Sequence, residues 1–398
     1  MTALLLAELR HNPLLWLLAL VPVVFIAQAV NPEAHTALFL LSMFAIVPLA
    51  ALLSHATESV SAKTGDTVGG LLNATLGNLT ELVIALTALR AGQYLLVKAS
   101  IAGAIVTNVL FMLGVSFILG GVRYHIQEFN RLSARLQASL LFLATIGLLI
   151  PSAVELADSH GEAAFRHELS LGLSGLLILA YGLGMVFSLK THRELFSGQA
   201  QAGHEAEGAT EEAEDHETPW PIGVALIVLA VVTIAVALVS EVFVESVQQA
   251  AEDFGMTPAF VGFIVVSLVG GAAEMVAAFS GARKNRLNLS VGIALGSASQ
   301  IALFVAPVLV LVSYFIGPSP MDLRFWPGAV AMMLIATLTA SLVTNSGRSA
   351  WFVGVLVLMV YLIFAMTLYL LPPDERAAAA VDAVPVAACS ITPATTSG

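Results

Sequence analysis

The feature that most constrains this sequence is a succession of long apolar segments, which recur along most of its 398 residues. Hydrophobic residues make up 58% of the chain and charged residues 11%, against roughly 25% charged residues in a soluble domain. The net charge of −11 provides no basic surface for DNA or RNA. This composition excludes an ordinary cytosolic enzyme, a nucleic-acid-binding protein and a disordered chain, and it predicts an integral membrane protein.

A membrane-spanning helix needs about 20 mostly apolar residues. We predict an all-α membrane protein with about eleven transmembrane helices. With a cytoplasmic N-terminus, eleven of the 16 Lys and Arg residues fall on the cytoplasmic side, so this orientation is favoured and the C-terminus lies outside. The predicted spans cover residues 13–30, 36–56, 65–91, 95–120, 134–156, 168–190, 220–247, 257–281, 288–316, 325–345 and 350–371.

Two parts of the sequence resemble each other at a constant offset of 193 residues. The matched pairs are Gly77 with Gly270, Glu81 with Glu274, and Gly103 with Gly296. Spans two to six and seven to eleven then form two five-helix repeats, and the odd number of spans inverts the second repeat. Inverted repeats are typical of secondary transporters, whose site lies near the membrane midplane between the repeats. The predicted domains are an extra N-terminal helix (1–33), the first repeat (34–190), an acidic cytoplasmic linker (191–218), the second repeat (219–371) and a disordered tail (372–398).

Two carboxylates lie deep inside predicted spans. Glu81 and Glu274 occupy matched positions, and the middle of no span contains a Lys or Arg that would neutralise them. An acid inside a membrane must pair, face a cavity or take up a proton, because an isolated charge there is costly. The remaining counter-charges are protons and metal cations. A pair that holds either protons or a metal ion has the minimum chemistry of proton-coupled antiport, so we predict both residues as cation ligands and proton carriers.

Neutral oxygen-bearing residues accompany the two acids. Hard cations such as Ca²⁺ bind six to eight oxygens from carboxylates, amides, backbone carbonyls and water. For each neutral residue, an interhelical hydrogen bond is at least as reasonable as metal ligation. The candidates are Asn73, Asn78, Thr80, Thr107, Asn108, Ser297, Ser299 and Gln300.

Three further acids, Glu58, Glu241 and Glu245, lie near the ends of predicted spans. They either line a path to the site or are interfacial acids. The linker between the repeats carries seven carboxylates and no Lys or Arg in residues 204–217, which fits a solvated linker or a weak regulatory cation sensor. These linker acids are Glu205, Glu207, Glu211, Glu212, Glu214, Asp215 and Glu217.

The two matched regions resemble the signature sequences of the cation/proton exchanger (CAX) family of Ca²⁺/H⁺ antiporters. The resemblance rests on GLLNATLGNLTELVIAL around Glu81, and on FVGFIVVSLVGGAAEM and ALGSASQIALFVAP around Glu274 and Gln300. It covers spans two to eleven, and an acidic stretch between the halves is also a family feature. It implies that Glu81 and Glu274 are the central ligands and that Asn78, Asn108, Ser297 and Gln300 are the additional ligands near them. Gly271 and Met275 stand where the family usually has Asn and His, which leaves the substrate ion open.

We therefore predict a secondary antiporter in a bacterial inner membrane or an organellar membrane. It exports cytosolic Ca²⁺ in exchange for H⁺, has no other cofactor, and contacts the lipid bilayer and no nucleic acid. Antiport of Na⁺, K⁺ or Mn²⁺ against H⁺ is the nearest alternative, and Na⁺/Ca²⁺ exchange is another. A cation channel or a membrane Ca²⁺ sensor represents a different class. An enzyme is disfavoured, because the sequence contains no Walker A motif and no nucleophile–base pair on a common loop.

Overall fold

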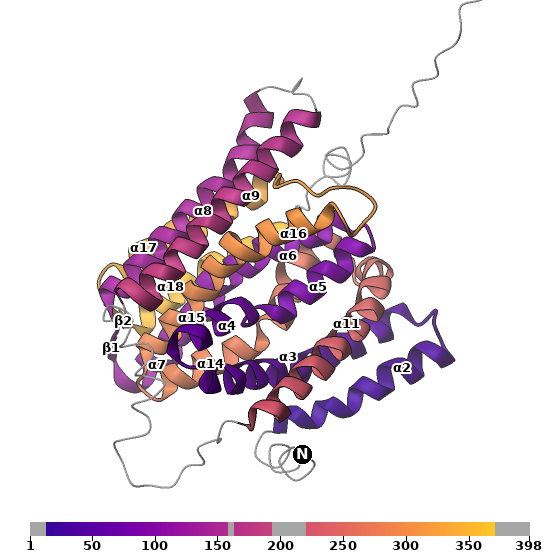
Figure 1. The fold of residues 1–398 in the computed structure, drawn as a ribbon, viewed down its shortest axis with the longest axis horizontal. Helices are drawn as coiled ribbons and strands as arrows, with labels where there is room; N and C mark the ends of the chain where they lie inside the picture. The colour runs from indigo at the N-terminus through magenta and orange to yellow at the C-terminus, as the bar shows by residue number, and fades with distance from the viewer. Residues whose placement is uncertain (1–12, 158–162, 193–219, 371–398) are drawn as a thin grey trace, which may run out of the picture.

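The computed structural model describes residues 13–157, 163–192 and 220–370, which are almost entirely helical (Figure 1). Within these residues, eight helices are long and apolar enough to cross a membrane, and ten spans result if each of two bent helix pairs is one span. The predicted first span is a 3₁₀ segment, η1 (Pro13–Ala19), followed by the short helix α2 (Leu20–Val30). Its 17 apolar residues, Leu14–Val30, fall short of a full span, so the predicted count of eleven is not confirmed.

The helices follow one another in two comparable series. The first comprises α3 (His35–Lys63), α4 (Asp66–Leu76), α5 (Leu79–Arg90), α6 (Tyr94–Val106), η2 (Thr107–Met112), α7 (Leu113–Tyr124), α8 (Arg131–Ala157), α9 (Ala163–Val186) and η3 (Phe187–Thr191). The second comprises α11 (Ile222–Asp253), α12 (Pro258–Phe260), η5 (Val261–Val266), α13 (Ser267–Gly270), α14 (Ala272–Arg283), α15 (Leu287–Gln300), η6 (Ile301–Val305), α16 (Ala306–Ser313), α17 (Pro327–Thr344) and α18 (Trp351–Leu370).

The offset of 193 residues holds in the helix boundaries as well as in the sequence. Adding 193 to both ends of α5 gives both ends of α14, and adding it to the first residue of α6 gives the first residue of α15. A π-helical segment interrupts both long helices at the matching place, η2 after α6 and η6 after α15. Such π-helical turns concentrate at functional sites. The two repeats therefore share one internal register around the matched acids.

Both predicted spans that carry the acids are broken. The first bends by 42° between α4 and α5 at Gly77 and Asn78, and the second bends by 60° between α13 and α14 at Gly271. Each break comes about three residues before the acid, so Glu81 and Glu274 lie in the first turn of α5 and α14. A helix N-terminus favours negative charge, and broken backbone is tolerated in a membrane where it faces protein or water. The breaks thus place both acids at helix starts inside the protein.

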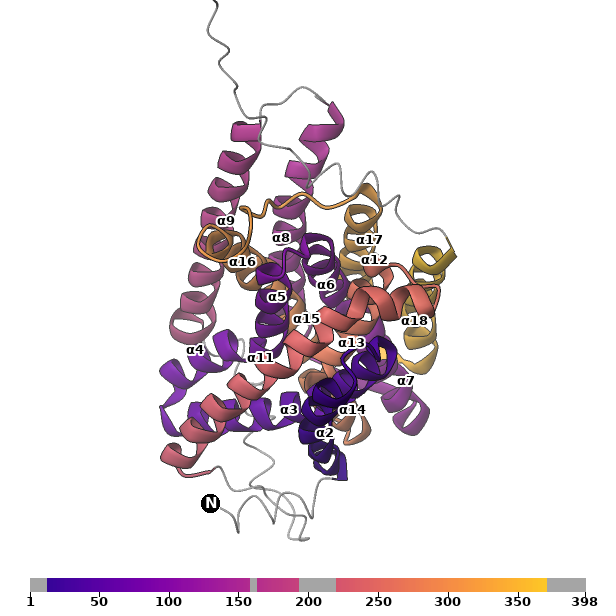
Figure 2. The same cartoon turned by 90° about the vertical axis from the view of Figure 1, so that its right-hand side faces the viewer.

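The long helices pack into two flanks around a central pair. Helix α3 lies along α11, where Phe39 stacks on Phe243 with ring centroids 5.2 Å apart, and α2 lies outside them (Figure 1). On the other flank α8 lies beside α9 and α17, and α8 and α9 extend beyond the rest of the helices (Figure 2). Between the flanks, α6 packs closely against η5. This arrangement brings the broken spans of both repeats to the middle of the protein.

The connections divide between two faces. Between the α3–α4 connection and the α14–α15 connection, the chain crosses the helix bundle an even number of times, so both connections lie on the same face. Lys63, Arg283 and Lys284 lie on this face. We call this the basic face and the other the opposite face. The two short strands β1 (Ile126–Glu128) and β2 (Arg348–Ala350) pair antiparallel at the basic face, a feature that the all-α prediction lacked.

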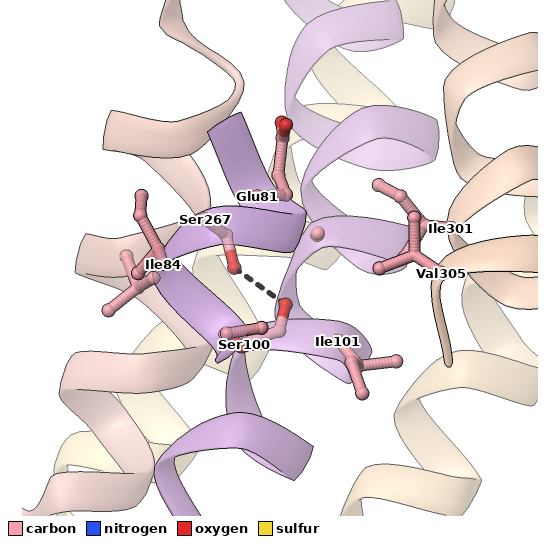
Figure 3. A pocket seen from close by; sticks show the side chains of 10 residues that line it. Glu81, Ile84, Ser100, Ile101, Ser267, Ile301 and Val305 are labelled. Carbon is pink, nitrogen blue, oxygen red and sulfur yellow. Dashed lines mark hydrogen bonds between the residues drawn. The ribbon is translucent and has the colours of Figure 1, made fainter. Parts of the chain in front are cut away.

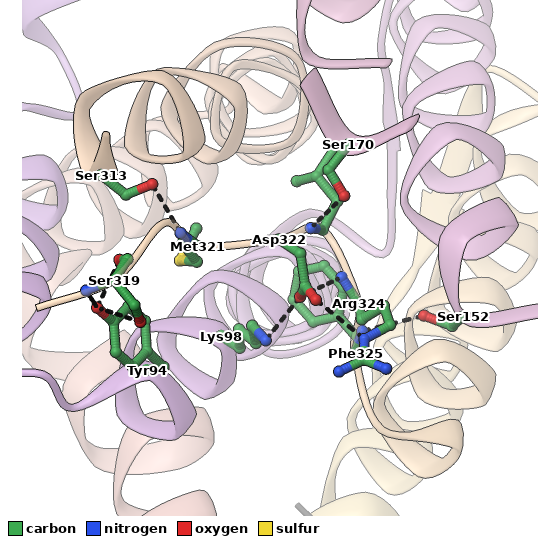
Figure 4. Close-up of polar contacts among 11 residues, drawn as sticks. Tyr94, Lys98, Ser152, Ser170, Ser313, Ser319, Met321, Asp322, Arg324 and Phe325 are labelled. Atoms are coloured by element: carbon green, nitrogen blue, oxygen red, sulfur yellow. Dashed lines mark hydrogen bonds and ion pairs between the residues drawn. The ribbon is translucent and has the colours of Figure 1, made fainter. Parts of the chain in front are cut away.

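The loop between α16 and α17 forms a buried cluster of charges at the opposite face (Figure 4). Asp322 Oδ1 accepts a hydrogen bond from Lys98 Nζ at 2.9 Å, and Arg324 Nε donates to Oδ2 at 3.0 Å. Hydroxyl groups fix the rest of the loop: Ser313 and Ser170 accept from the backbone of Met321 and Leu323. The loop therefore ties α6 to α9 and α16.

Acid should weaken this cluster. Burial by itself raises the pKa of Asp322, but attraction to Lys98 and hydrogen bonds from Lys98 and Arg324 outweigh it, so the pKa lies below its usual value. A lowered pKa in the folded state stabilises the protein above the unfolded-state pKa of about 3.9, and this stabilisation is lost as the pH falls through the folded-state value. We expect thermal unfolding in detergent to show this loss only below about pH 4. The Asp322→Asn variant should lack that component, and identical acid profiles would contradict the assignment.

Candidate functional site

The broken span of the second repeat lies against the acid of the first. A Cβ atom added to Gly270 would lie 3.1 Å from Cγ and 3.6 Å from Oε1 of Glu81. A side chain here would press against Glu81, and the matched residue, Gly77, stands at the other break. Gly270 lies four residues before Glu274, so its close approach to Glu81 brings the predicted pair of acids into one region.

Glu274 carries a buried oxygen that forms no hydrogen bond. Its Oε2 atom is enclosed without a partner among the described residues, and within this part of the chain neither Glu81 nor Glu274 forms an ion pair with Lys or Arg. Over the same residues, no group of three or more His, Cys, Asp and Glu side chains forms a metal cluster. Two acids without basic partners suit an ion that enters and leaves better than a structural salt bridge, because buried carboxylates require a counter-charge or a proton.

The four predicted neutral ligands form one continuous chain of hydrogen bonds. Asn108 Nδ2 donates to Ser297 Oγ at 2.8 Å, and Ser297 Oγ donates to Asn78 Oδ1 at 2.8 Å. Asn78 Nδ2 then donates to Gln300 Oε1 at 2.6 Å. All three of these hydrogen bonds cross between the repeats. The structure thus brings the four residues together through the interhelical hydrogen bonds considered for them, while their role as ligands stays a prediction.

Asn78 holds the centre of this chain, and its removal should be costly. In Asn78→Leu, Gln300 Oε1 loses a donor and the Ser297 hydroxyl loses an acceptor, each worth about 1–3 kcal/mol when left unsatisfied. We expect the half-saturating cation concentration for transport to rise at least about tenfold, which corresponds to 1.4 kcal/mol. Thr75→Val is the matched control, because Thr75 Oγ1 bonds only to carbonyls of its own helix. Equal effects of the two substitutions would exclude a specific role for Asn78.

A cavity of about 220 Å³ reaches Glu274 from one side. It opens toward the basic face, since its walls include the end of α3, the start of α15 and the part of α4 that precedes the break. Glu58 lines it and accepts a hydrogen bond from Ser54 Oγ at 3.3 Å. The lining residues are Ser54, Glu58, Asn73, Gly77, Glu274, Ala277, Leu289, Gly292, Ile293, Gly296, Ser297 and Gln300. Four of the predicted site residues, Glu58, Glu274, Ser297 and Gln300, therefore line one cavity.

The two other predicted pathway acids lie elsewhere. Glu241 pairs with Arg90 at 3.3 Å, and Glu245 Oε2 accepts a hydrogen bond from Gln28 at 3.3 Å. Neither lines the cavity at Glu274. The seven predicted regulatory acids of the linker lie outside the described residues, as does the predicted tail, so both stay predictions.

Some polar residues around the acids were not predicted. Ser54 lies one helical turn before Glu58, and a hydroxyl one turn from an acid in an apolar span is a signal that the sequence offered. Ser100 and Ser267 lie near Glu81 (Figure 3). Nothing in the local sequence links these two residues, because they meet only where α6 contacts α13.

The fold and the site together define a class of protein. The two matched acids lie on two inverted repeats and have no basic partner among the described residues. A cavity reaches one of them from a single face. This arrangement is typical of an ion-coupled secondary transporter. The family model described as "Sodium/calcium exchanger protein" matches residues 34–190 and 224–370. The chain belongs to this family.

Individual relatives agree with the family match. The chain is 40% identical to "Ca(2+)/H(+) antiporter" of Aphanothece halophytica over 343 residues, which cover 85% of this chain and 91% of the relative. It is 40% identical to "Ca(2+)/H(+) antiporter ChaA" of Bacillus subtilis over 84% of this chain and 92% of the relative. The solved structure "Structure of native YfkE" is similar with a TM-score of 0.75 and 36% identity, covering 89% of this chain and 98% of that one. The structure titled "Crystal Structure of H+/Ca2+ Exchanger CAX" has the same fold, with a TM-score of 0.67 and 16% identity.

Proposed function

We propose that this protein is a Ca²⁺/H⁺ antiporter in which Glu81 and Glu274 alternate between a Ca²⁺-bound and a protonated state. One observation carries the proposal: the acids of the two repeats lie in one region of the helix bundle without a basic partner among the described residues, and Oε2 of Glu274 is buried without a hydrogen bond. A divalent cation or two protons neutralise such a pair equally well. The names of the relatives from Aphanothece halophytica and Bacillus subtilis support Ca²⁺ as the cation.

The same pair explains why an empty carrier does not cycle. Enclosing two bare carboxylates costs far more than enclosing two neutral acids or two acids that bind Ca²⁺, because burial of an uncompensated charge is expensive. Only the loaded forms therefore pass between the two faces. Exchange of one ion for the other follows from this restriction.

The direction of transport follows from the basic face. Because Lys and Arg mark cytoplasmic loops, we assign the cavity at Glu274 to the cytoplasmic side. Ca²⁺ then enters from the cytosol past Glu58, and protons return down their gradient. A bacterial inner membrane or an organellar membrane suits this role, and the relatives include a "Vacuolar cation/proton exchanger 2" of rice.

Reconstitution tests the proposal. Purified protein in liposomes with an imposed pH gradient is supplied with Ca²⁺, Mn²⁺, Na⁺ or K⁺, and proton flux is followed with a pH-sensitive dye. We expect Ca²⁺ to collapse the gradient at the lowest concentration. Proton flux with Na⁺ or K⁺ but not with Ca²⁺ would reject Ca²⁺ as the substrate. If none of the four cations produced proton flux, antiport would be rejected.

A further inference from the structure

Two tyrosines occupy corresponding places in the two repeats. Tyr181 lies on α9, near the end of the first repeat, and its ring stacks on Phe304 of the second repeat with centroids 5.2 Å apart. Tyr361 lies on α18, the last helix of the second repeat, and its ring packs on Phe111 of the first repeat at 5.3 Å. Phe111 and Phe304 are themselves separated by the repeat offset of 193 residues. Each tyrosine therefore contacts the same position of the facing repeat.

The sequence repeat does not reveal this correspondence. Tyr181 and Tyr361 are 180 residues apart, not 193. Part of the difference comes from the helices that precede them, because α17 has 18 residues where α8 has 27. The two tyrosines therefore match in space but not at the constant offset in sequence.

Both phenylalanines belong to π-helical segments that border the hydrogen-bond chain of the site. Phe111 lies in η2, whose second residue is Asn108, and Phe304 lies in η6, which begins directly after Gln300. Asn108 and Gln300 are the two ends of the chain. Because π-helical turns are rare and occur mostly as single turns, the side chains that pack on them help to decide their shape. The two tyrosine–phenylalanine pairs thus pack on the segments that orient both ends of the chain.

The hydroxyl of Tyr181 also reaches the broken span of the first repeat. It donates a hydrogen bond to the carbonyl oxygen of Ala74 at 2.9 Å. Ala74 lies in the last turn of α4, where carbonyls lack donors within their own helix, and the break follows directly. Tyr181 thus connects the end of α4 with η6. Asn78 follows the first of these elements and Gln300 precedes the second, and their side chains are hydrogen-bonded at 2.6 Å.

The hydroxyl of Tyr361 bonds to the other end of the chain. It accepts a hydrogen bond from Thr107 Oγ1 at 3.4 Å, and the two residues are 3% and 0% exposed. Thr107 is the first residue of η2, and the next residue, Asn108, donates to Ser297. This bond is longer than that of Tyr181, so the ring of Tyr361 matters more than its hydroxyl.

We propose that Tyr181 and Tyr361 are positioning residues for the cation site, each fixing one end of the neutral hydrogen-bond chain from the facing repeat. They act through the broken span and the π-helical segments and do not bind the ion. Oxygen ligands bind a cation tightly only when packing and outer hydrogen bonds hold them within about 0.5 Å of the binding geometry. The inference rests on the proposed antiport, because it assigns the residues that orient the oxygens of that site.

Transport kinetics test Tyr181 through the variant Tyr181→Phe, which keeps the ring on Phe304 and removes only the hydroxyl. In liposomes with an imposed pH gradient, we expect the half-saturating Ca²⁺ concentration to rise several-fold while the maximal rate stays close to that of the parent protein. The matched control is Tyr369→Phe, because Tyr369 is 51% exposed and stacks on Phe260; it should change neither value. An unchanged half-saturating concentration, or a fall in the maximal rate alone, would overturn the role of Tyr181.

Two substitutions test Tyr361 in the same assay. Tyr361→Phe loses only the long bond to Thr107 and should raise the half-saturating concentration slightly. Tyr361→Leu also loses the ring that packs on Phe111 and should raise it several-fold. If Tyr361→Leu transports with the half-saturating concentration of the parent protein, Tyr361 has no positioning role.

Hydrogen–deuterium exchange tests the positioning independently of the transported ion. Measured by mass spectrometry in detergent, backbone amides at the α4–α5 break and in η6 should exchange several-fold faster in Tyr181→Phe, and those in η2 should do so in Tyr361→Leu. Amides in α17 should exchange as in the parent protein in both variants. Parent-like exchange in all these segments would overturn the proposal, whatever ion is carried. Faster exchange in a protein without Ca²⁺-coupled proton flux would support the positioning and reject only the proposed substrate.

Discussion

Glu81→Gln and Glu274→Gln should each abolish proton-coupled Ca²⁺ transport while the protein still folds. Glutamine has the size of glutamate, so packing against Gly270 is kept, but it neither carries a proton nor offers a full negative charge. One unit charge pair at 4 Å is worth about 4 kcal/mol at an effective dielectric constant of 20, which is about a thousandfold in binding. We expect Ca²⁺ uptake into liposomes, driven by a pH gradient, to fall below detection in both variants.

The control for this result is Glu168→Gln on α9, an exposed glutamate outside the cavity at Glu274. It removes the same charge and should transport like the parent protein. Thermal unfolding in detergent checks that all three variants fold. If either site variant keeps full uptake, the matched acids are not the ion carriers, whatever the substrate.

The positions of the helices were largely predictable, because the membrane requires long apolar runs. The span predicted at 95–120 is the continuous helix Tyr94–Tyr124, and that predicted at 350–371 is α18 (Trp351–Leu370). The helices are broken at Gly77 and Gly271, whereas Pro48 and Gly103 stand inside unbroken helices, so a glycine or proline in a span does not by itself predict a break. At the N-terminus, the length of the apolar run predicted the structure less well, because the run is divided between η1 and α2.

Contacts between distant loops were not predictable from local sequence. The strands β1 and β2 are three residues each and lie more than 200 residues apart, so neither shows a recognisable strand pattern. The same holds for Asp322, whose partner Lys98 lies near the start of another helix. Such pairings arise because tertiary packing brings loop ends together, and no periodicity in the sequence records them.

The sequence predicted which residues form the site but not the conformation of the site. The internal repeat identified Glu81 and Glu274, because the two halves of the sequence match at a constant offset of 193 residues. The structure places these two residues in one region. The sequence is the same in every conformation, however, so it does not reveal that a cavity reaches Glu274 from the basic face. Nor does it reveal that α6 is pressed against η5 and α13 at Gly103, whereas the matched Gly296 has no neighbour within 4 Å of an added Cβ atom.

Lys98→Met should destabilise the protein by about 1–3 kcal/mol, because one buried oxygen of Asp322 loses its hydrogen-bond donor while Arg324 stays paired with the other. Lys98 and Asp322 are 3% and 8% exposed, and their charged atoms are 2.9 Å apart. Methionine fills the space of the lysine stem but cannot donate to Asp322 Oδ1. Arg324 keeps only its own bonds to that carboxylate. Chemical unfolding in detergent measures the loss, with Lys98→Arg as the variant that keeps the charge.

A double-mutant cycle separates this loss from a general packing defect. If the ion pair is responsible, Lys98→Met combined with Asp322→Asn should cost less than the sum of the two single substitutions, with a coupling of about 0.5–3 kcal/mol. A packing defect would instead add without coupling, and that outcome would contradict the ion-pair explanation. Because Lys98 lies on α6, loss of the pair should also loosen the opposite-face end of the helix that carries Gly103 and continues to Asn108.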